Sequence, residues 1–94
     1  MTEEEIRKEL SQIAISEIGK KYVLSAAVAS HDDVEGGEQL EIFVKLRPDA
    51  PSVSGDNYIS VLLKARDFLS SIGDSRRPSI LLERAHSAGA STAK

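Results

Sequence analysis

The chain has 94 residues, of which 40% are hydrophobic and 29% are charged, and its formal net charge is −3. This length supports one domain with one core, and the mild acidity argues against a dedicated nucleic-acid binder, whose surface is usually basic. Because cysteine is absent, disulfides and cysteine-ligated metal sites are excluded, and a cytoplasmic location is favoured. The N-terminus does not resemble a signal peptide. No apolar stretch approaches the roughly 20 residues that cross a bilayer, so we expect no membrane partner.

The first predicted helix spans residues 2–18. Thr2 and Glu5 form a T-x-x-E capping box, in which each side chain accepts a hydrogen bond from the other residue's backbone N–H. Gly19 supplies the left-handed position that often ends a helix. Apolar residues recur at helical spacing between these two signals, and the expected buried face consists of Ile6, Leu10, Ile13, Ala14 and Ile18.

Two strands joined by a tight turn are predicted next, over residues 21–30 and 40–46. The glycine pair at 36–37 supplies the positive φ angles of a hairpin tip, which we place at residues 31–39. The first strand has an apolar face made of Tyr22, Leu24, Ala26 and Val28. The second strand has an apolar face made of Leu40, Ile42, Val44 and Leu46. Its other face is mixed and consists of Glu41, Phe43 and Lys45.

The longest periodic segment predicts a second helix over residues 56–73, after a Pro/Ser/Gly-rich loop at 47–55. Asp56 is the expected N-cap and Gly73 the expected glycine that follows the last turn. The apolar stripe of this helix consists of Tyr58, Val61, Leu62, Ala65, Phe68, Leu69 and Ile72.

A third strand is predicted over residues 78–84, because Ile80 and Leu82 share one face and Pro78 suits the first residue of a strand. The following segment, residues 85–94, contains only small and polar residues without periodicity. We therefore predict a disordered C-terminal tail and a single domain that covers residues 1–84.

The order α-β-β-α-β predicts an α+β fold, a two-layer sandwich with two helices on one face of a three-stranded sheet. A right-handed β-α-β crossover makes the third strand parallel to the second. It lies either beside the second strand or beside the first, and the sequence leaves both arrangements open. The order resembles RNA-binding sheets of the KH type, but the chain contains no Gly-x-x-Gly loop, so no family is assigned.

The sheet face without helices is expected to be partly apolar, because Val23, Phe43 and Leu81 point to it together with several alanines. An open apolar face on a small domain suggests association. On the second helix, Ile59 and Leu63 lie beside the main stripe, where they either contact a partner or are covered by the 47–55 loop. We therefore expect a non-enzymatic binding module that contacts a protein partner or forms a homodimer through Phe43, Ile59, Leu63 and Leu81.

An alternative hypothesis is an anion-binding or nucleic-acid-binding module. The layout predicts an acidic pole at the hairpin tip and a basic pole beside the N-terminus of the second helix. A helix N-terminus with basic side chains can hold a phosphate or carboxylate, although Asp56 opposes this. The residues of the basic pole are Lys20, Lys21, Lys45 and Arg47.

No catalytic residue, metal or cofactor is expected. The two histidines, His31 and His86, have no second ligand at a suitable spacing, and the serines lack an organised base. Residues 76–79, Arg-Arg-Pro-Ser, resemble a basophilic kinase site. We instead expect both arginines to pair with acidic residues of the hairpin tip, and we expect Ser79 to be held within a strand.

Overall fold

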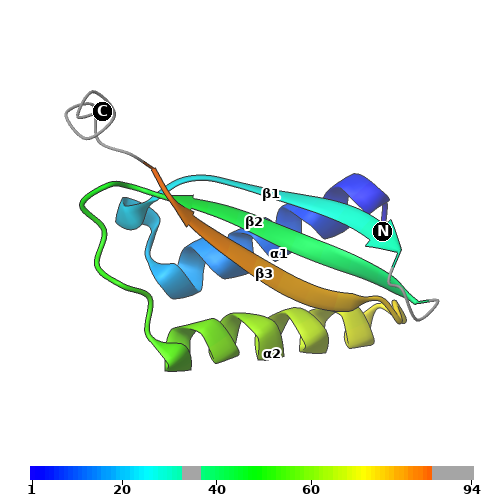
Figure 1. The fold of residues 1–94 in the computed structure, drawn as a ribbon. Helices are drawn as coiled ribbons and strands as arrows, with labels where there is room; N and C mark the ends of the chain where they lie inside the picture. The colour runs from blue at the N-terminus through cyan, green and yellow to red at the C-terminus, as the bar shows by residue number, and fades with distance from the viewer. Residues whose placement is uncertain (33–36, 86–94) are drawn as a thin grey trace.

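The computed structural model describes residues 1–32 and 37–85, which form a sheet with two helices packed on one side (Figure 1). This confirms the predicted α+β fold. Positions 33–36 of the predicted hairpin tip and residues 86–94 of the predicted tail lie outside the described residues. The elements, with one short 3-10 turn η1, are α1 (Glu3–Ile18), η1 (Lys20–Tyr22), β1 (Val23–Asp32), β2 (Glu38–Leu46), α2 (Gly55–Ser71) and β3 (Arg77–Arg84).

The capping box at the start of α1 forms as predicted. The Thr2 N–H donates to Glu5 Oε1 at 2.8 Å, and the Glu5 N–H donates to Thr2 Oγ1 at 3.1 Å. At the other end Gly19 has φ 118°, and its N–H donates to the Ile15 carbonyl at 2.9 Å. The face between these ends is buried at Ile6, Leu10, Ala14 and Ile18, and Ile13 is partly buried.

The predicted N-cap of α2 is wrong by two residues. Ser54, whose backbone is extended, caps the helix by accepting a hydrogen bond from the Asn57 N–H at 3.1 Å, while Asp56 lies inside the first turn. Serine and aspartate cap equally well, so local sequence could not separate them. The C-terminus follows the prediction: Gly73 has φ 75°, and the Asp74 N–H reaches back to the Leu69 carbonyl at 2.9 Å in a Schellman motif.

The sheet has the order β1-β2-β3, antiparallel between β1 and β2 and parallel between β2 and β3. The third strand therefore lies beside the second, which resolves the two arrangements that the sequence allowed. The core lies between the sheet and the helices, and its buried residues are Ile6, Leu10, Ala14, Ile18, Val28, Leu40, Ile42, Val44, Leu46, Ala50, Val61, Ala65, Leu69 and Ile80.

A β-bulge at Leu24 overturns part of the predicted face of the first strand. Val23 pairs with Leu46 and Ser25 pairs with Lys45, so Leu24 is the extra residue. One extra residue shifts the alternation by one position. As a result Leu24 is 53% exposed, whereas Val23, which we expected on the open face, is partly buried against the core.

Across the described ranges, no helix combines the length and the apolar character that crossing a membrane requires.

Candidate interaction surface

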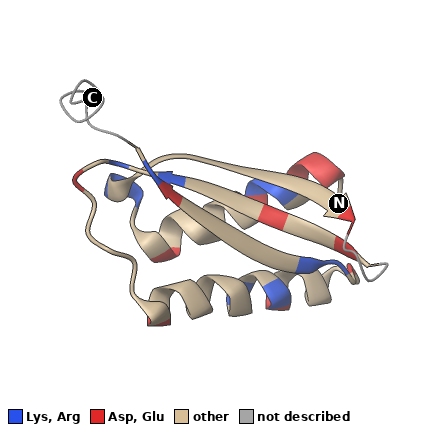
Figure 2. Cartoon of the chain, viewed as in Figure 1, with Lys and Arg blue, Asp and Glu red and all other residues tan. Residues whose placement is uncertain are grey.

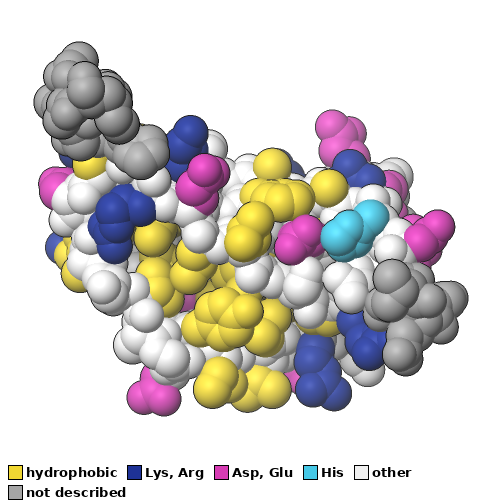
Figure 3. Space-filling view, viewed as in Figure 1, with side chains coloured by type: hydrophobic (Ala, Val, Ile, Leu, Met, Phe, Trp, Pro, Cys, Tyr) yellow, Lys and Arg dark blue, Asp and Glu magenta, His cyan; other side chains and the backbone are white. Residues whose placement is uncertain are grey.

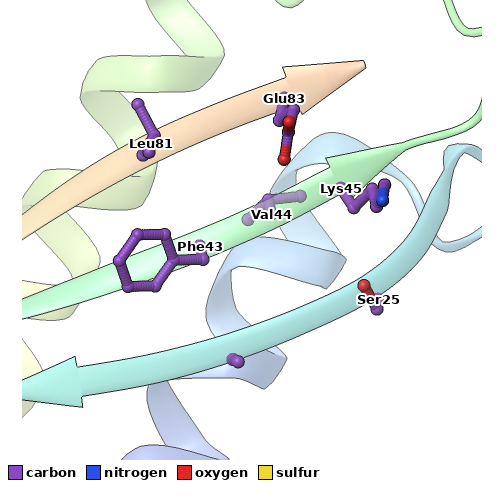
Figure 4. A pocket seen from close by; sticks show the side chains of 7 residues that line it. Ser25, Phe43, Val44, Lys45, Leu81 and Glu83 are labelled. Atoms are coloured by element: carbon purple, nitrogen blue, oxygen red, sulfur yellow. The ribbon is translucent and has the colours of Figure 1, made fainter. Parts of the chain in front are cut away.

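The face of the sheet opposite the helices is open, and an apolar row crosses its centre. The register aligns Ala27 of β1 with Phe43 of β2 and Leu81 of β3. Phe43 is 39% exposed and Leu81 is 51% exposed. A shallow hollow of about 160 Å³ lies beside the Phe43 and Leu81 side chains (Figure 4), and its lining residues are Ser25, Ala27, Phe43, Val44, Lys45, Leu81 and Glu83.

Rows that contain charged residues flank this apolar row on both sides. Ser25, Lys45 and Glu83 are aligned on one side, and Ala29, Glu41 and Ser79 on the other. Lys45 and Glu83 carry opposite charges on neighbouring strands, which is a favourable cross-strand pair. The open face thus has an apolar centre with a charged rim, the usual layout of a protein-binding surface.

The outer flank of α2 is a second exposed apolar region. Ile59 is 54% exposed and Leu63 is 51% exposed, so the 47–55 loop does not cover them. They are four residues apart and share one side of the helix. Between this flank and the sheet, the Tyr58 hydroxyl lies 3.5 Å from the Ile80 carbonyl of β3. Figure 3 shows hydrophobic side chains over the centre of the sheet and along α2.

The four predicted partner residues therefore fall into two pairs. Phe43 and Leu81 are direct neighbours on the sheet, whereas Ile59 and Leu63 lie on α2, beyond the edge of β3. The bulge adds the exposed Leu24. The sequence did not reveal Leu24, because the strict alternation of the strand assigned it to the buried face.

The four basic residues of the alternative hypothesis do not converge on one point. Figure 2 shows the Lys and Arg positions spread over helices, strands and a loop. Lys20 and Lys21 lie in η1, where Lys21 Nζ is 5.1 Å from the Tyr22 ring centroid. Arg47 Nε is 3.3 Å from Asp49 Oδ1. Lys45 is on the open face, so the sheet separates it from the helices.

The N-terminus of α2 is already occupied by groups of the chain itself. Ser54 accepts a hydrogen bond there, and the Asn57 side-chain amide donates to the Glu17 carbonyl at 3.2 Å. The Glu17 carboxylate accepts from Ser60 Oγ at 2.7 Å and from Lys64 Nζ at 2.6 Å. The Lys64 hydrogen bond is the main reason that the pKa of Glu17 is lowered. This carboxylate and Asp56 make the helix end unfavourable for an anion.

Arg76 ties together three segments at the opposite end of the sheet. Its guanidinium is 2.6 Å from Asp74 Oδ2, 2.9 Å from Glu3 Oε1 of α1 and 4.0 Å from Glu38 Oε2 of β2. Hydrogen bonds from Arg76 are the largest cause of the lowered pKa values of Glu3 and Asp74, and these acids in turn raise the pKa of Arg76. The prediction named acidic residues of the hairpin tip as partners of Arg76. Glu38 belongs to that segment, but it is the most distant of the three acids, and the prediction missed Asp74, two residues away.

His31 and Ser79 are the remaining sequence candidates within the described residues, and His86 lies outside them. His31 lies in β1 rather than in the turn, with Nε2 3.3 Å from Gln39 Oε1 and 3.8 Å from Glu41 Oε1. Ser79 lies within β3, as predicted, and its hydroxyl oxygen is buried. Within residues 1–32 and 37–85, no three acidic or histidine side chains gather as a metal site.

No protein-family model matches the chain, and a comparison with curated proteins finds no match.

Proposed function

We propose that this chain is a small non-enzymatic binding module that acts through protein–protein contacts on its open sheet face. The observation that supports the proposal is the neighbouring pair Phe43 and Leu81, both substantially exposed on a sheet face that neither helix covers. Burial of exposed apolar area is the main driving force of protein association, and each of these side chains contributes about 1–2 kcal/mol when its exposed part is covered.

The matching partner is a protein with an apolar surface and polar groups at its margin. Lys45 and Glu83 on one side and Glu41 on the other would orient such a partner on the apolar row. Ile59 and Leu63 would extend the contact to a partner that reaches around the edge of β3. A cytoplasmic location belongs to the same proposal and rests on the absence of cysteine.

The test compares capture of a native partner by three forms of the full chain. The forms are the wild type, the double variant Phe43→Ser with Leu81→Ser, and a control with Lys8→Ser and Gln12→Ser on the exposed side of α1. We expect the wild type and the control to retain the same partner, and we expect the sheet variant to lose it. Retention should persist at high salt, because an apolar contact depends little on ionic strength.

The opposite pattern would favour the anion-binding alternative. Binding that disappears as salt rises, and that is abolished by Lys45→Glu with Arg47→Glu while Phe43→Ser with Leu81→Ser leaves it intact, would contradict the proposal. A specific turnover activity that survives in the sheet variant would contradict its non-enzymatic part.

A further inference from the structure

The two edges of the sheet differ in how they are protected. Edge strands expose unpaired backbone N–H and C=O groups, and proteins usually block them with charge, proline or a covering group. β3 has such protection: Arg77, Glu83 and Arg84 are charged, and Pro78 has no N–H. In addition, Tyr58 reaches the Ile80 carbonyl, and the Arg84 guanidinium donates to the Ala50 carbonyl beside this edge.

β1 has no comparable protection along most of its length. Its first eight residues, 23–30, contain neither a charged side chain nor a proline. The Arg47 N–H donates to the Tyr22 carbonyl, and the register pairs Ser25 with Lys45. The backbone of Arg47 therefore faces β1, and so does that of every second residue of β2, including Lys45. Their partners Ser25, Ala27 and Ala29 in turn direct their backbone groups toward β2.

It follows that the N–H and C=O groups of Ala26, Val28 and Ser30 point away from β2, outward from the edge of the sheet. In the described part of the chain, no hydrogen bond outside the β1–β2 ladder reaches these groups. Unpaired backbone groups of this kind are a template for another extended strand. The edge of β1 is therefore the place where the sheet can be extended.

We infer that β1 pairs with β1 of a second copy of this chain, antiparallel and about a two-fold axis at Val28. This register uses the whole strand from the bulge at Leu24 to Asp32. It places Ala26 opposite Ser30 and Ala27 opposite Ala29 of the second copy, so no charged residue faces a like charge. The result is one continuous sheet of twice the width, with the helices of both copies on one side.

Charge complementarity favours a second copy over an unrelated strand. β1 begins next to the basic residues Lys20 and Lys21 and ends at the acidic Asp32. Antiparallel pairing brings the acidic end of each strand toward the basic end of the other, which steers the two copies into this orientation. The small side chains of Ala27 and Ala29 also leave the neighbouring strand free to approach. The inference is independent of the partner-binding role proposed for Phe43 and Leu81.

The test uses pairs of charges that face each other only in this register. In a dimer centred on Val28, Ala27→Lys with Ala29→Lys (the Lys/Lys variant) places like charges directly opposite, whereas Ala27→Glu with Ala29→Lys (the Lys/Glu variant) places opposite charges there. Both variants keep a lysine at position 29, which faces Glu41 of the same chain, so they differ only at position 27. By sedimentation equilibrium we expect the wild type and the Lys/Glu variant to be dimers, and we expect the Lys/Lys variant to be a monomer of half the mass.

Ser30→Pro provides an independent check, because it removes an N–H at the outer edge of β1 and leaves the hydrogen bonds between β1 and β2 intact. This variant should be folded by circular dichroism and monomeric by sedimentation equilibrium. A wild type that stays monomeric at millimolar concentration would overturn the inference, as would dimeric Lys/Lys and Ser30→Pro variants or a monomeric Lys/Glu variant. Loss of the dimer in Phe43→Ser with Leu81→Ser would instead indicate face-to-face association and would also contradict edge pairing.

Discussion

The Arg76 guanidinium holds the Glu3 carboxylate in a two-pronged hydrogen bond across 73 positions of sequence, with Nη1 3.0 Å from Oε2 and Nη2 2.9 Å from Oε1. The same guanidinium also binds Asp74, and its side chain is only 14% exposed. This geometry fixes the start of α1 against the turn that leads into β3. Planar, two-pronged contacts of this kind are stronger and more specific than single ion pairs.

Removal of this cation should destabilise the fold. We expect Arg76→Ala to lower the free energy of unfolding by about 2 kcal/mol, because charged hydrogen bonds are lost and Asp74 is left partly buried without its partner. The exposed Arg66 of α2 is a matched control, and Arg66→Ala should change this free energy by less than about 0.5 kcal/mol. Urea unfolding measures both values, and equal losses would show that Arg76 has no special role.

The free energy of unfolding should decrease in acid, because Glu3 and Asp74 lose their charges and with them their ionic contacts with Arg76. The pKa values of Glu3 and Asp74 are lowered from ordinary values of 4.5 and 3.8, chiefly by hydrogen bonds from Arg76. A carboxyl with a lower pKa in the folded state binds fewer protons there than in the unfolded state. Its contribution is therefore complete above the ordinary pKa and disappears as the pH falls through the lowered one.

We accordingly expect the midpoint of urea unfolding to be constant near neutral pH and to decrease as the pH falls below about 5. Arg76→Ala should flatten this decrease without abolishing it, because the pKa values of Glu5 and Glu17 are lowered by other partners, Thr2 and Lys64. A variant whose acid profile runs parallel to that of the wild type would contradict this assignment.

Two glycines should respond to alanine in opposite ways. At Gly19 φ is 118°, and an added Cβ would lie 3.1 Å from Cδ2 of Tyr22, so Gly19→Ala should cost about 2 kcal/mol. At Gly55, in the first turn of α2, an added Cβ would meet nothing within 4 Å. Gly55→Ala should therefore stabilise the chain by about 0.5 kcal/mol. Thermal melting measures both changes, and a shared sign would refute the distinction.

Much of the candidate surface could be predicted because side-chain direction in a strand alternates with a period of two. That rule placed Phe43 and Leu81 on the open face, and helical periodicity placed Ile59 and Leu63 beside the buried stripe of α2. The exposure of Ile59 and Leu63 could not be predicted, since it depends on the path of the 47–55 loop. The bulge at Leu24 could not be predicted either, because the residue types of the predicted first strand also fit a regular strand without a bulge.

The sequence by itself determined which segments become helices and strands and which of their sides are apolar. These properties depend on steric preferences and hydrogen bonds within a few residues, as the capping box of Thr2 and Glu5 illustrates. Tertiary structure alone decided that β3 lies beside β2, that Leu24 is exposed and that Arg76 binds Glu3 of α1. Each of these outcomes depends on competition between whole elements for the same core, which no short stretch of sequence records.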